Sequence, residues 1–190
     1  MGGFLHTIGS LLPYHLLSYG ALVGTEVYQC YKLLTSTRRH QSFVNTKLCF
    51  QALPMREFLA LQKRLFPVYF KCQVGLAALT AATHPPYSIL SLVKDPWGAA
   101  PLVVVLVMGS LNWFVYGPRT TTASLVRRAL GERENKATDS SEGKIHRANR
   151  DFARNHAMSI HLNAIALVAT VWYGFSLSSS LVPVEALNQR

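Results

Sequence analysis

The chain has 190 residues, of which 49% are hydrophobic and only 15% are charged. Soluble domains carry about 25% charged residues, so this composition argues against an ordinary soluble globule and against a disordered chain. The formal net charge is +10, but the basic residues stand in loops beside apolar segments. That distribution is typical of membrane proteins and not of a nucleic-acid-binding surface. We therefore predict an integral membrane protein whose partner is the lipid bilayer and not a nucleic acid.

Four apolar windows are long enough to span a bilayer, whose core of about 30 Å needs roughly 20 helical residues. In chain order they are residues 14–34, 66–83, 99–116 and 157–177. The first window is the most polar, because it contains Glu26 and Gln29. The windows predict an all-α fold, in which residues 1–190 form a single integral membrane domain built as a four-helix transmembrane bundle.

The distribution of lysine and arginine predicts the orientation of this bundle. Residues 32–64 contain seven basic residues and one acidic residue, and residues 118–156 contain nine basic and five acidic residues. With four spans both stretches lie on one side, and an excess of lysine and arginine marks the cytosolic side. We therefore expect both termini to be non-cytosolic. The basic loops are candidates to bind anionic lipid.

The second basic stretch contains a further helical pattern. Pro118 stands where a helix can start. After it, apolar residues recur at helical spacing: Leu125, Val126, Ala129 and Leu130. The pattern predicts a cytosolic amphipathic helix on the lipid headgroups or, as the alternative, a solvated extension of the third span. Residues 135–144 are polar and predict a flexible loop.

Polar side chains recur near the cytosolic ends of the predicted spans, whereas we expect the outer half of the bundle to be apolar. In the fourth span His156, Ser159 and Asn163 are spaced i, i+3 and i+7, so they share one helical face. Ionisable groups at this depth are costly unless they are paired or hydrated. One interpretation is structural: Glu26 forms an ion pair with Lys71, and the other groups hydrogen-bond between helices.

The other interpretation is a binding pocket that opens to the cytosol. Its candidate residues are Glu26, Gln29, Asn112, Arg119, His156 and Asn163. Glu26 and His156 would bind a cation or relay a proton there. Arg119 would suit an anion or a lipid phosphate near the interface.

Catalytic motifs are missing from the sequence. It contains no GxSxG, no HExxH and no Gly-rich phosphate loop. His156 and His161 are spaced i, i+5 and make a poor metal pair, and the three cysteines include no CxxC. We therefore expect no enzyme, no cofactor and no metal site. An intramembrane enzyme that uses His156 is a minor alternative.

Several strings occur together in a fixed order and spacing. They are Leu61–Phe70 before the second span, Leu17–Gly20 in the first span, Asn112 followed by Gly117–Thr121, and the His156, Ser159 and Asn163 face. In this order the chain resembles the transmembrane protein 205-like family, and its fungal branch in particular, over about residues 14–177. The resemblance implies a four-span fold at an endomembrane or the plasma membrane. Family members have been linked to vesicle traffic and to tolerance of platinum drugs.

The sequence departs from that family in two respects. Cys30–Gln41 looks like a 12-residue insertion, which we interpret as a splice or gene-model variant. The family usually has a neutral residue near Glu26 and no lysine at position 71, so the two together look like a compensated pair. The leading hypothesis is a non-enzymatic protein of transport or trafficking with a cytosol-facing pocket. The alternative is a structural or adaptor membrane protein whose polar residues only fix helix packing. Homo-oligomerisation is left open.

Overall fold

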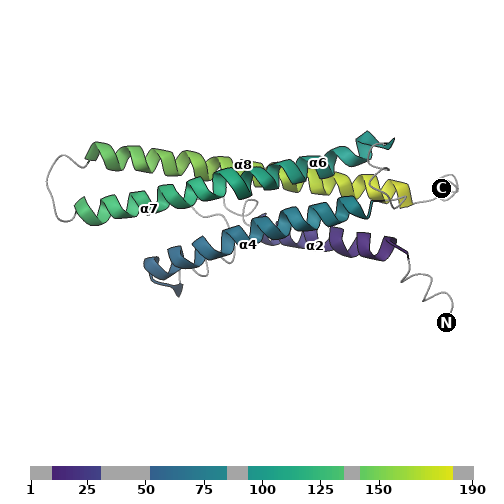
Figure 1. The fold of residues 1–190 in the computed structure, drawn as a ribbon, viewed down its shortest axis with the longest axis horizontal. Helices are drawn as coiled ribbons and strands as arrows, with labels where there is room; N and C mark the ends of the chain where they lie inside the picture. Colours follow the sequence, from purple (N-terminus) through teal and green to yellow (C-terminus); the bar gives the residue numbers. More distant parts are fainter. Residues whose placement is uncertain (1–9, 31–51, 85–93, 135–141, 182–190) are drawn as a thin grey trace.

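A computed structural model of the chain describes residues 10–30, 52–84, 94–134 and 142–181, and the secondary structure in these parts is helical throughout. The helices are α2 (Leu12–Cys30), α4 (Met55–Ala82), α6 (Pro96–Leu111), the π-helical η1 (Asn112–Tyr116), α7 (Gly117–Glu134) and α8 (Glu142–Leu181). Because α6, η1 and α7 follow one another without a break, the described chain forms four long rods (Figure 1). The all-α prediction is confirmed.

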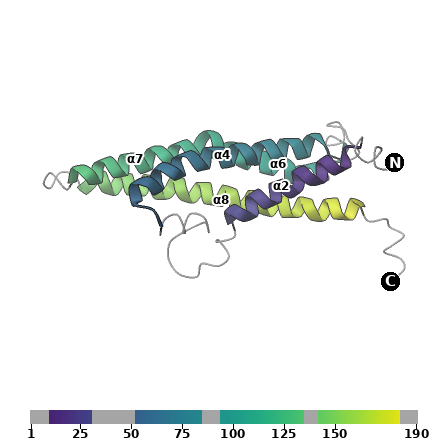
Figure 2. The ribbon, with the colours of Figure 1, turned by 90° about the horizontal axis from the view of Figure 1, so that it is seen from below.

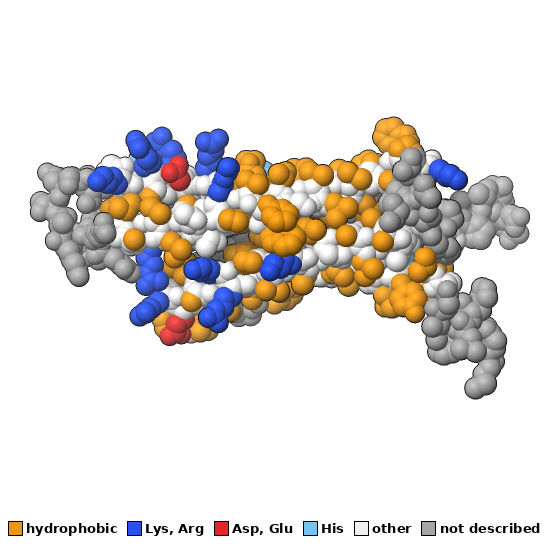
Figure 3. Space-filling view, in the orientation of Figure 1, with side chains coloured by type: hydrophobic (Ala, Val, Ile, Leu, Met, Phe, Trp, Pro, Cys, Tyr) orange, Lys and Arg blue, Asp and Glu red, His pale blue; other side chains and the backbone are white. Residues whose placement is uncertain are grey.

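The rods lie side by side, and α8 contacts two of the others extensively. It packs along α6, α7 and α2, while α4 packs against α2 and α6. Helix α2 begins and α8 ends at the same end of the bundle, and α7 and α8 extend together at the other end (Figures 1 and 2). On the face shown in Figure 3, lysine and arginine gather at the end to which α7 and α8 extend. We call this the basic end, and the other the opposite end.

Three helices are long and apolar enough to cross a membrane. They are Arg56–Ala82, Pro96–Gly131 and Gly143–Leu181. The prediction of a transmembrane protein is thereby supported, whereas the count of four spans is not established, because α2 is too polar to meet the same measure. The exact limits of the predicted spans stay a prediction.

The burial pattern is the reverse of that in a soluble protein. Leu17, Val168 and Phe175 are 72%, 69% and 74% exposed, whereas Glu26 and Asn112 are completely buried. On the face shown in Figure 3, most of the coloured side chains between the two ends are apolar. Such a surface is stable when lipid surrounds it, because lipid solvates apolar side chains and cannot hydrogen-bond polar ones.

Small residues allow the rods to approach closely at the centre. Ala77 of α4 and Ala166 and Ala169 of α8 pack with Leu22 of α2 and Val105 of α6 in one buried cluster. Small side chains are typical of contacts between membrane helices, where van der Waals packing is a principal attraction. We call these five residues the apolar layer. It lies at the centre of the bundle, where α2, α4, α6 and α8 meet.

The π-helical turn follows from a local sequence feature, Gly117 followed by Pro118. Proline has no N–H, so Pro118 cannot close the α-helical hydrogen bond to the carbonyl four residues earlier. The preceding N–H, that of Gly117, bonds to the carbonyl of Asn112, five residues earlier. A Cβ atom on residue 117 would lie 2.7 Å from that carbonyl oxygen. Glycine therefore permits the wide turn, and proline favours it.

The residues after Pro118 do not start a separate helix. Helix α7 continues from η1 and packs along α8. Of the two alternatives for this segment, the structure shows the extension of the third rod, and a helix lying on headgroups is not shown. The predicted loop at 135–144 and the insertion at 30–41 fall mostly outside the described residues. Residues 142–144 form the first turn of α8.

Candidate functional site

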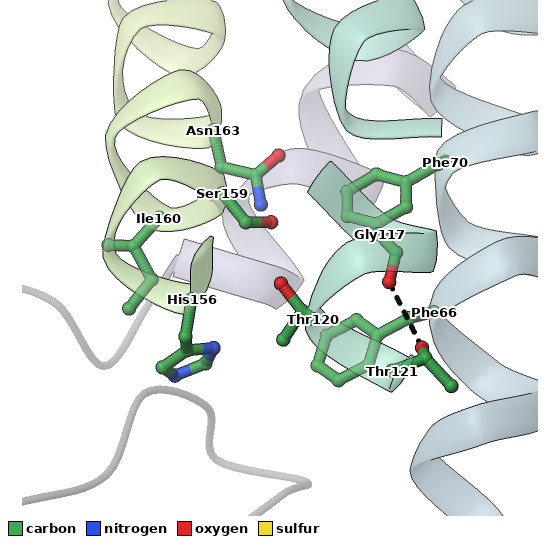
Figure 4. A pocket seen from close by; sticks show the side chains of 9 residues that line it. All are labelled: Phe66, Phe70, Gly117, Thr120, Thr121, His156, Ser159, Ile160 and Asn163. Carbon is green, nitrogen blue, oxygen red and sulfur yellow. Dashed lines mark hydrogen bonds between the residues drawn. The ribbon is translucent and has the colours of Figure 1, made fainter. Parts of the chain in front are cut away.

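A small cavity lies between α4, α7 and α8 near the basic end (Figure 4). Its lining residues are Phe66, Phe70, Gly117, Thr120, Thr121, His156, Ser159, Ile160 and Asn163. The cavity measures about 40 Å³. Since one water needs about 10–15 Å³ of such volume, about three or four waters fit. Drug-sized ligands occupy roughly 300–1,000 Å³, so the cavity in this conformation suits water or a small ion.

One wall of the cavity is apolar and consists of the Phe66 and Phe70 rings of α4. The facing wall carries polar groups of α7 and α8. The Thr121 hydroxyl donates to the carbonyl of Gly117 at 3.0 Å, as drawn in Figure 4. The Thr120 hydroxyl is buried and has no hydrogen-bond partner among the described residues. The His156 ring is partly buried and stacks on Phe152, with 5.4 Å between the centroids. A hydroxyl and an imidazole are therefore available to a small guest.

Asn112 connects the π-helical turn to α8 beside the cavity. Its amide Nδ2 donates to Oδ1 of Asn163 at 3.0 Å and to the carbonyl of Ser159 at 3.2 Å. The other amide oxygen, Oδ1 of Asn112, is buried and lacks a partner in the described chain. The π-helical turn begins at Asn112, so this turn positions the amide toward α8. The pairing fits the structural interpretation, and the unpaired oxygen leaves one acceptor for a guest.

Glu26 pairs with a residue other than the one predicted. Its Oε1 accepts a hydrogen bond of 2.8 Å from Nε2 of Gln73. Lys71 is exposed, with its ammonium group 6.0 Å from the centre of the Trp113 ring. The prediction of a Glu26–Lys71 ion pair is therefore wrong. Two successive steps of 100° along a helix place residues 71 and 73 on opposite faces of α4, so only Gln73 reaches the interior.

The six predicted pocket residues separate into groups. Asn112, His156 and Asn163 come together at or beside the cavity. Glu26 lies deeper in the bundle, with Gln73. Arg119 is exposed and lines a different, open groove of about 400 Å³ between α7 and α8, together with Asp151. The side chain of Gln29 lies outside the described residues.

A second polar cluster lies at the opposite end, where the sequence led us to expect apolar packing. Nδ1 of His15 is 3.1 Å from Oγ1 of Thr83, and its Nε2 is 2.8 Å from the Tyr173 hydroxyl. Beside them, Thr80 donates to the Ser18 hydroxyl at 3.1 Å. The expectation of an apolar outer half is therefore wrong: here buried polar groups join α2, α4 and α8.

The sequence does carry a signal for this second cluster. On α8, Thr170 and Tyr173 continue the helical face of Ser159 and Asn163 at spacings of 7 and 3. On α2 the buried residues His15, Ser18, Leu22 and Glu26 follow each other at spacings of 3, 4 and 4. Residues spaced i, i+3 and i+7 lie on one face of a helix. When such a face is polar in a membrane bundle, it is the face that points to the interior.

A bundle with a polar interior, an apolar exterior and long apolar helices defines the chain as a membrane protein. Within that class it belongs to the family described as "Domain of unknown function (DUF4149)", whose profile matches residues 17–129. It is 57% identical over 182 residues to "Xanthocillin biosynthesis cluster protein D" of Aspergillus fumigatus, a match that covers 96% of this chain and 98% of that relative. No solved structure matches the chain.

Proposed function

We propose that this chain is a four-span, non-enzymatic membrane protein that binds a small polar guest in a cytosol-facing cavity, as part of a transport or trafficking step. The observation that carries this proposal is the buried, unpartnered Thr120 hydroxyl in a water-sized cavity that His156 also lines. An unpartnered buried hydroxyl is costly unless a guest or a water satisfies it. The cavity also lies where a π-helical turn interrupts a long helix, and such turns are frequent at functional sites.

The fourth span in this proposal is α2. Its low hydropathy comes from side chains that face the interior, because His15, Ser18 and Glu26 are 0%, 4% and 0% exposed. Its outward residues are apolar, as Leu17 and Val27 illustrate. A hydropathy average cannot separate inward from outward residues, whereas lipid contacts only the outward ones. The shared end of α2 and α8 is consistent with an even number of crossings.

The basic end is the proposed cytosolic end. Among the described residues, Arg56, Lys63 and Arg64 belong to the first half of α4, which begins toward the basic end, and α7 and the start of α8, which reach that end, carry several arginines (Figure 1). Lys94 stands before α6, which begins at the opposite end. The positive-inside bias then puts both termini on the non-cytosolic face. An endomembrane or the plasma membrane is the proposed address, and anionic lipid headgroups are the proposed ligands of the basic residues.

The relative supplies a biological setting for the proposal. Its name places it with a xanthocillin biosynthesis cluster, and its identity to this chain extends over nearly the whole of both sequences. By extension, we propose that the present chain is a membrane component that serves the biosynthesis of a compound. Membership of the transmembrane protein 205-like family, which the sequence resembles, is part of the same proposal.

An adaptor function is the second candidate, and a specific observation favours it. The pairs Asn112–Asn163 and Glu26–Gln73 join neighbouring helices, as polar residues do when they only fix helix packing. The cavity would then hold structural water. Under this alternative the basic end binds a partner, and the polar interior has no exchangeable guest.

Access to the cavity distinguishes the two candidates. A cysteine is placed at Thr120 or His156 in a full-length background that has serine in place of the native cysteines 30, 49 and 72. Matched controls are Ala166→Cys, which is buried in the apolar layer, and Val168→Cys, which is 69% exposed on the apolar surface. Sealed microsomes, with the cytosolic face outward, are treated with silver ion, a thiol-reactive cation that is small enough for a water-sized cavity. The pocket predicts reaction at positions 120 and 156 and none at the controls. Unreactive positions 120 and 156 would favour the adaptor.

A further inference from the structure

Glu26 is a carboxyl group in the interior of the bundle without a basic partner in the described chain. It is 0% exposed and follows Leu22 of the apolar layer by one turn of α2. On α4 the nearest cation, Lys71, points outward against Trp113. An ionised carboxylate that is neither hydrated nor paired is strongly disfavoured in such surroundings. A proton on the carboxyl group removes this cost.

The hydrogen bonding around Glu26 favours a bound proton. Nε2 of Gln73 donates to Oε1 of Glu26 at 2.8 Å. Two further oxygens, Oε2 of Glu26 and Oε1 of Gln73, are buried and have no partner among the described residues. Both are acceptors when the carboxyl group is ionised, so neither can satisfy the other. A single proton on Oε2 turns it into a donor, and the amide and the acid can then exchange two hydrogen bonds.

The remaining described neighbours of Glu26 bring hydroxyl groups and no charged side chain. From α8 the Thr170 hydroxyl faces the carboxyl group, and its Oγ1 has no aligned hydrogen bond within the described residues. The Tyr19 hydroxyl, the titratable group on α2 that faces Glu26, donates to the Thr170 carbonyl at 3.1 Å. On α6, Gly109 lies beside Gln73 and has no side chain. No described element places a second charge on the acid.

We propose that Glu26 is a proton-binding site, held as a neutral acid in a reciprocal hydrogen-bonded pair with Gln73. A hard metal cation fits the site less well, because such ions take about six or more oxygen ligands, and Glu26, Gln73 and Thr170 together supply four side-chain oxygens. The proton-binding site goes beyond the proposed function and does not require that the cavity binds a guest.

One polar route toward Glu26 begins at the basic end. Gly109, beside Gln73, and Asn112, beside the cavity, are three residues apart on the same rod, which is about 4.5 Å of helix rise. The polar groups of Asn112, Asn163 and the cavity therefore lead from the basic end toward Gln73. Toward the opposite end Leu22 and Ala77 of the apolar layer follow on α2 and α4, and the Tyr19 and Thr170 hydroxyls pass beside them between α2 and α8.

Infrared difference spectroscopy of the purified full-length protein in nanodiscs tests this inference. We expect a carbonyl band of a protonated carboxylic acid at neutral pH, lost in Glu26→Gln and kept in Glu57→Gln, which removes an exposed carboxylate from α4. Gln73→Leu removes the reciprocal partner and should shift the band to higher frequency without abolishing it. This variant keeps the test valid if Glu26→Gln fails to fold. Absence of the band at neutral pH, or its persistence in folded Glu26→Gln, would overturn the proposal.

Sodium binding is the competing explanation, and thermal unfolding separates it from proton binding. Melting temperatures of the wild type and of Glu26→Gln are compared in sodium chloride and in choline chloride at the same ionic strength. A bound proton predicts equal values in the two salts. A sodium-specific increase that is lost in Glu26→Gln would assign the site to the cation and overturn the proton-binding proposal. Neither result depends on thiol access to the cavity, so the two proposals can fail separately.

Discussion

The Tyr19 hydroxyl of α2 lies against Gly174 of α8, in the space that a Cβ atom at residue 174 would occupy. The same hydroxyl donates to the Thr170 carbonyl at 3.1 Å. Glycine at position 174 therefore allows the tyrosine to reach the backbone of α8. This contact joins α2 to α8, the longest of the described helices.

Gly174→Ala should consequently destabilise the protein. The added methyl group collides with the Tyr19 hydroxyl, and overpacking of this kind costs about 1–3 kcal/mol. Gly24→Ala on α2 is the matched control, because nothing lies within 4 Å of its Cβ position. Thermal unfolding in detergent should show a lower melting temperature for Gly174→Ala alone. Equal melting temperatures would mean that α2 does not dock on α8 in this manner.

Gly117→Ala should disrupt the π-helical turn. The new Cβ atom would lie 2.7 Å from the backbone carbonyl of Asn112, and a backbone atom cannot move aside as a flexible side chain can. We expect a loss of about 1–3 kcal/mol, together with faster amide hydrogen exchange around residues 112–117. Gly131→Ala, in the same helix but without a contact within 4 Å, should be neutral or stabilising. An unchanged exchange pattern in Gly117→Ala would contradict the account of the turn.

Gln73→Leu should be more harmful than Lys71→Leu. Loss of Gln73 removes the donor of the 2.8 Å bond to Glu26 and leaves a buried carboxyl group unsatisfied, at a cost of about 1–3 kcal/mol. Lys71 contributes at most a cation–π contact with Trp113, worth about 0.5–1 kcal/mol at an exposed site. Unfolding by denaturant in mixed micelles measures both. A larger loss for Lys71→Leu would restore the ion pair that the sequence suggested.

Asn112 and Asn163 should be energetically coupled. Asn112→Leu and Asn163→Leu each break the 3.0 Å hydrogen bond, so the double variant should lose less stability than the sum of the single losses. We expect a coupling of about 0.6–2 kcal/mol, the range for hydrogen bonds between membrane helices. A double-mutant cycle on unfolding free energies measures it. Strict additivity would show that the two amides do not interact.

Part of this architecture could be predicted from the sequence because lipid imposes simple requirements. The Val103–Val107 run can only be solvated by lipid or protein, so a long apolar helix there was predictable. Lysine and arginine cannot enter hydrocarbon cheaply, so their clusters mark the ends of helices. The helical face that carries Ser159 and Asn163 was equally readable, because both residues are polar at helical spacing in an apolar segment.

The partners of individual groups could not be predicted in the same way. Lys71 and Gln73 are both polar, and sequence alone does not say which face of α4 is inward. Opposite charge suggests Lys71 as the partner of Glu26. The rotation of α4 instead brings Gln73 to Glu26. The cluster around His15 was not predicted, because we expected an apolar outer half. The partners of His15 on α4 and α8 are also far away in the sequence.

The central claim, a four-span bundle with its basic end in the cytosol, is tested most directly by glycosylation mapping. An Asn-X-Thr acceptor on a flexible spacer is inserted, one position at a time, before residue 10, within residues 135–141 or after Arg190, and each chain is expressed in cells. The account predicts sugar addition at the two terminal positions and none within residues 135–141. Modification within residues 135–141, or at only one terminus, would contradict it.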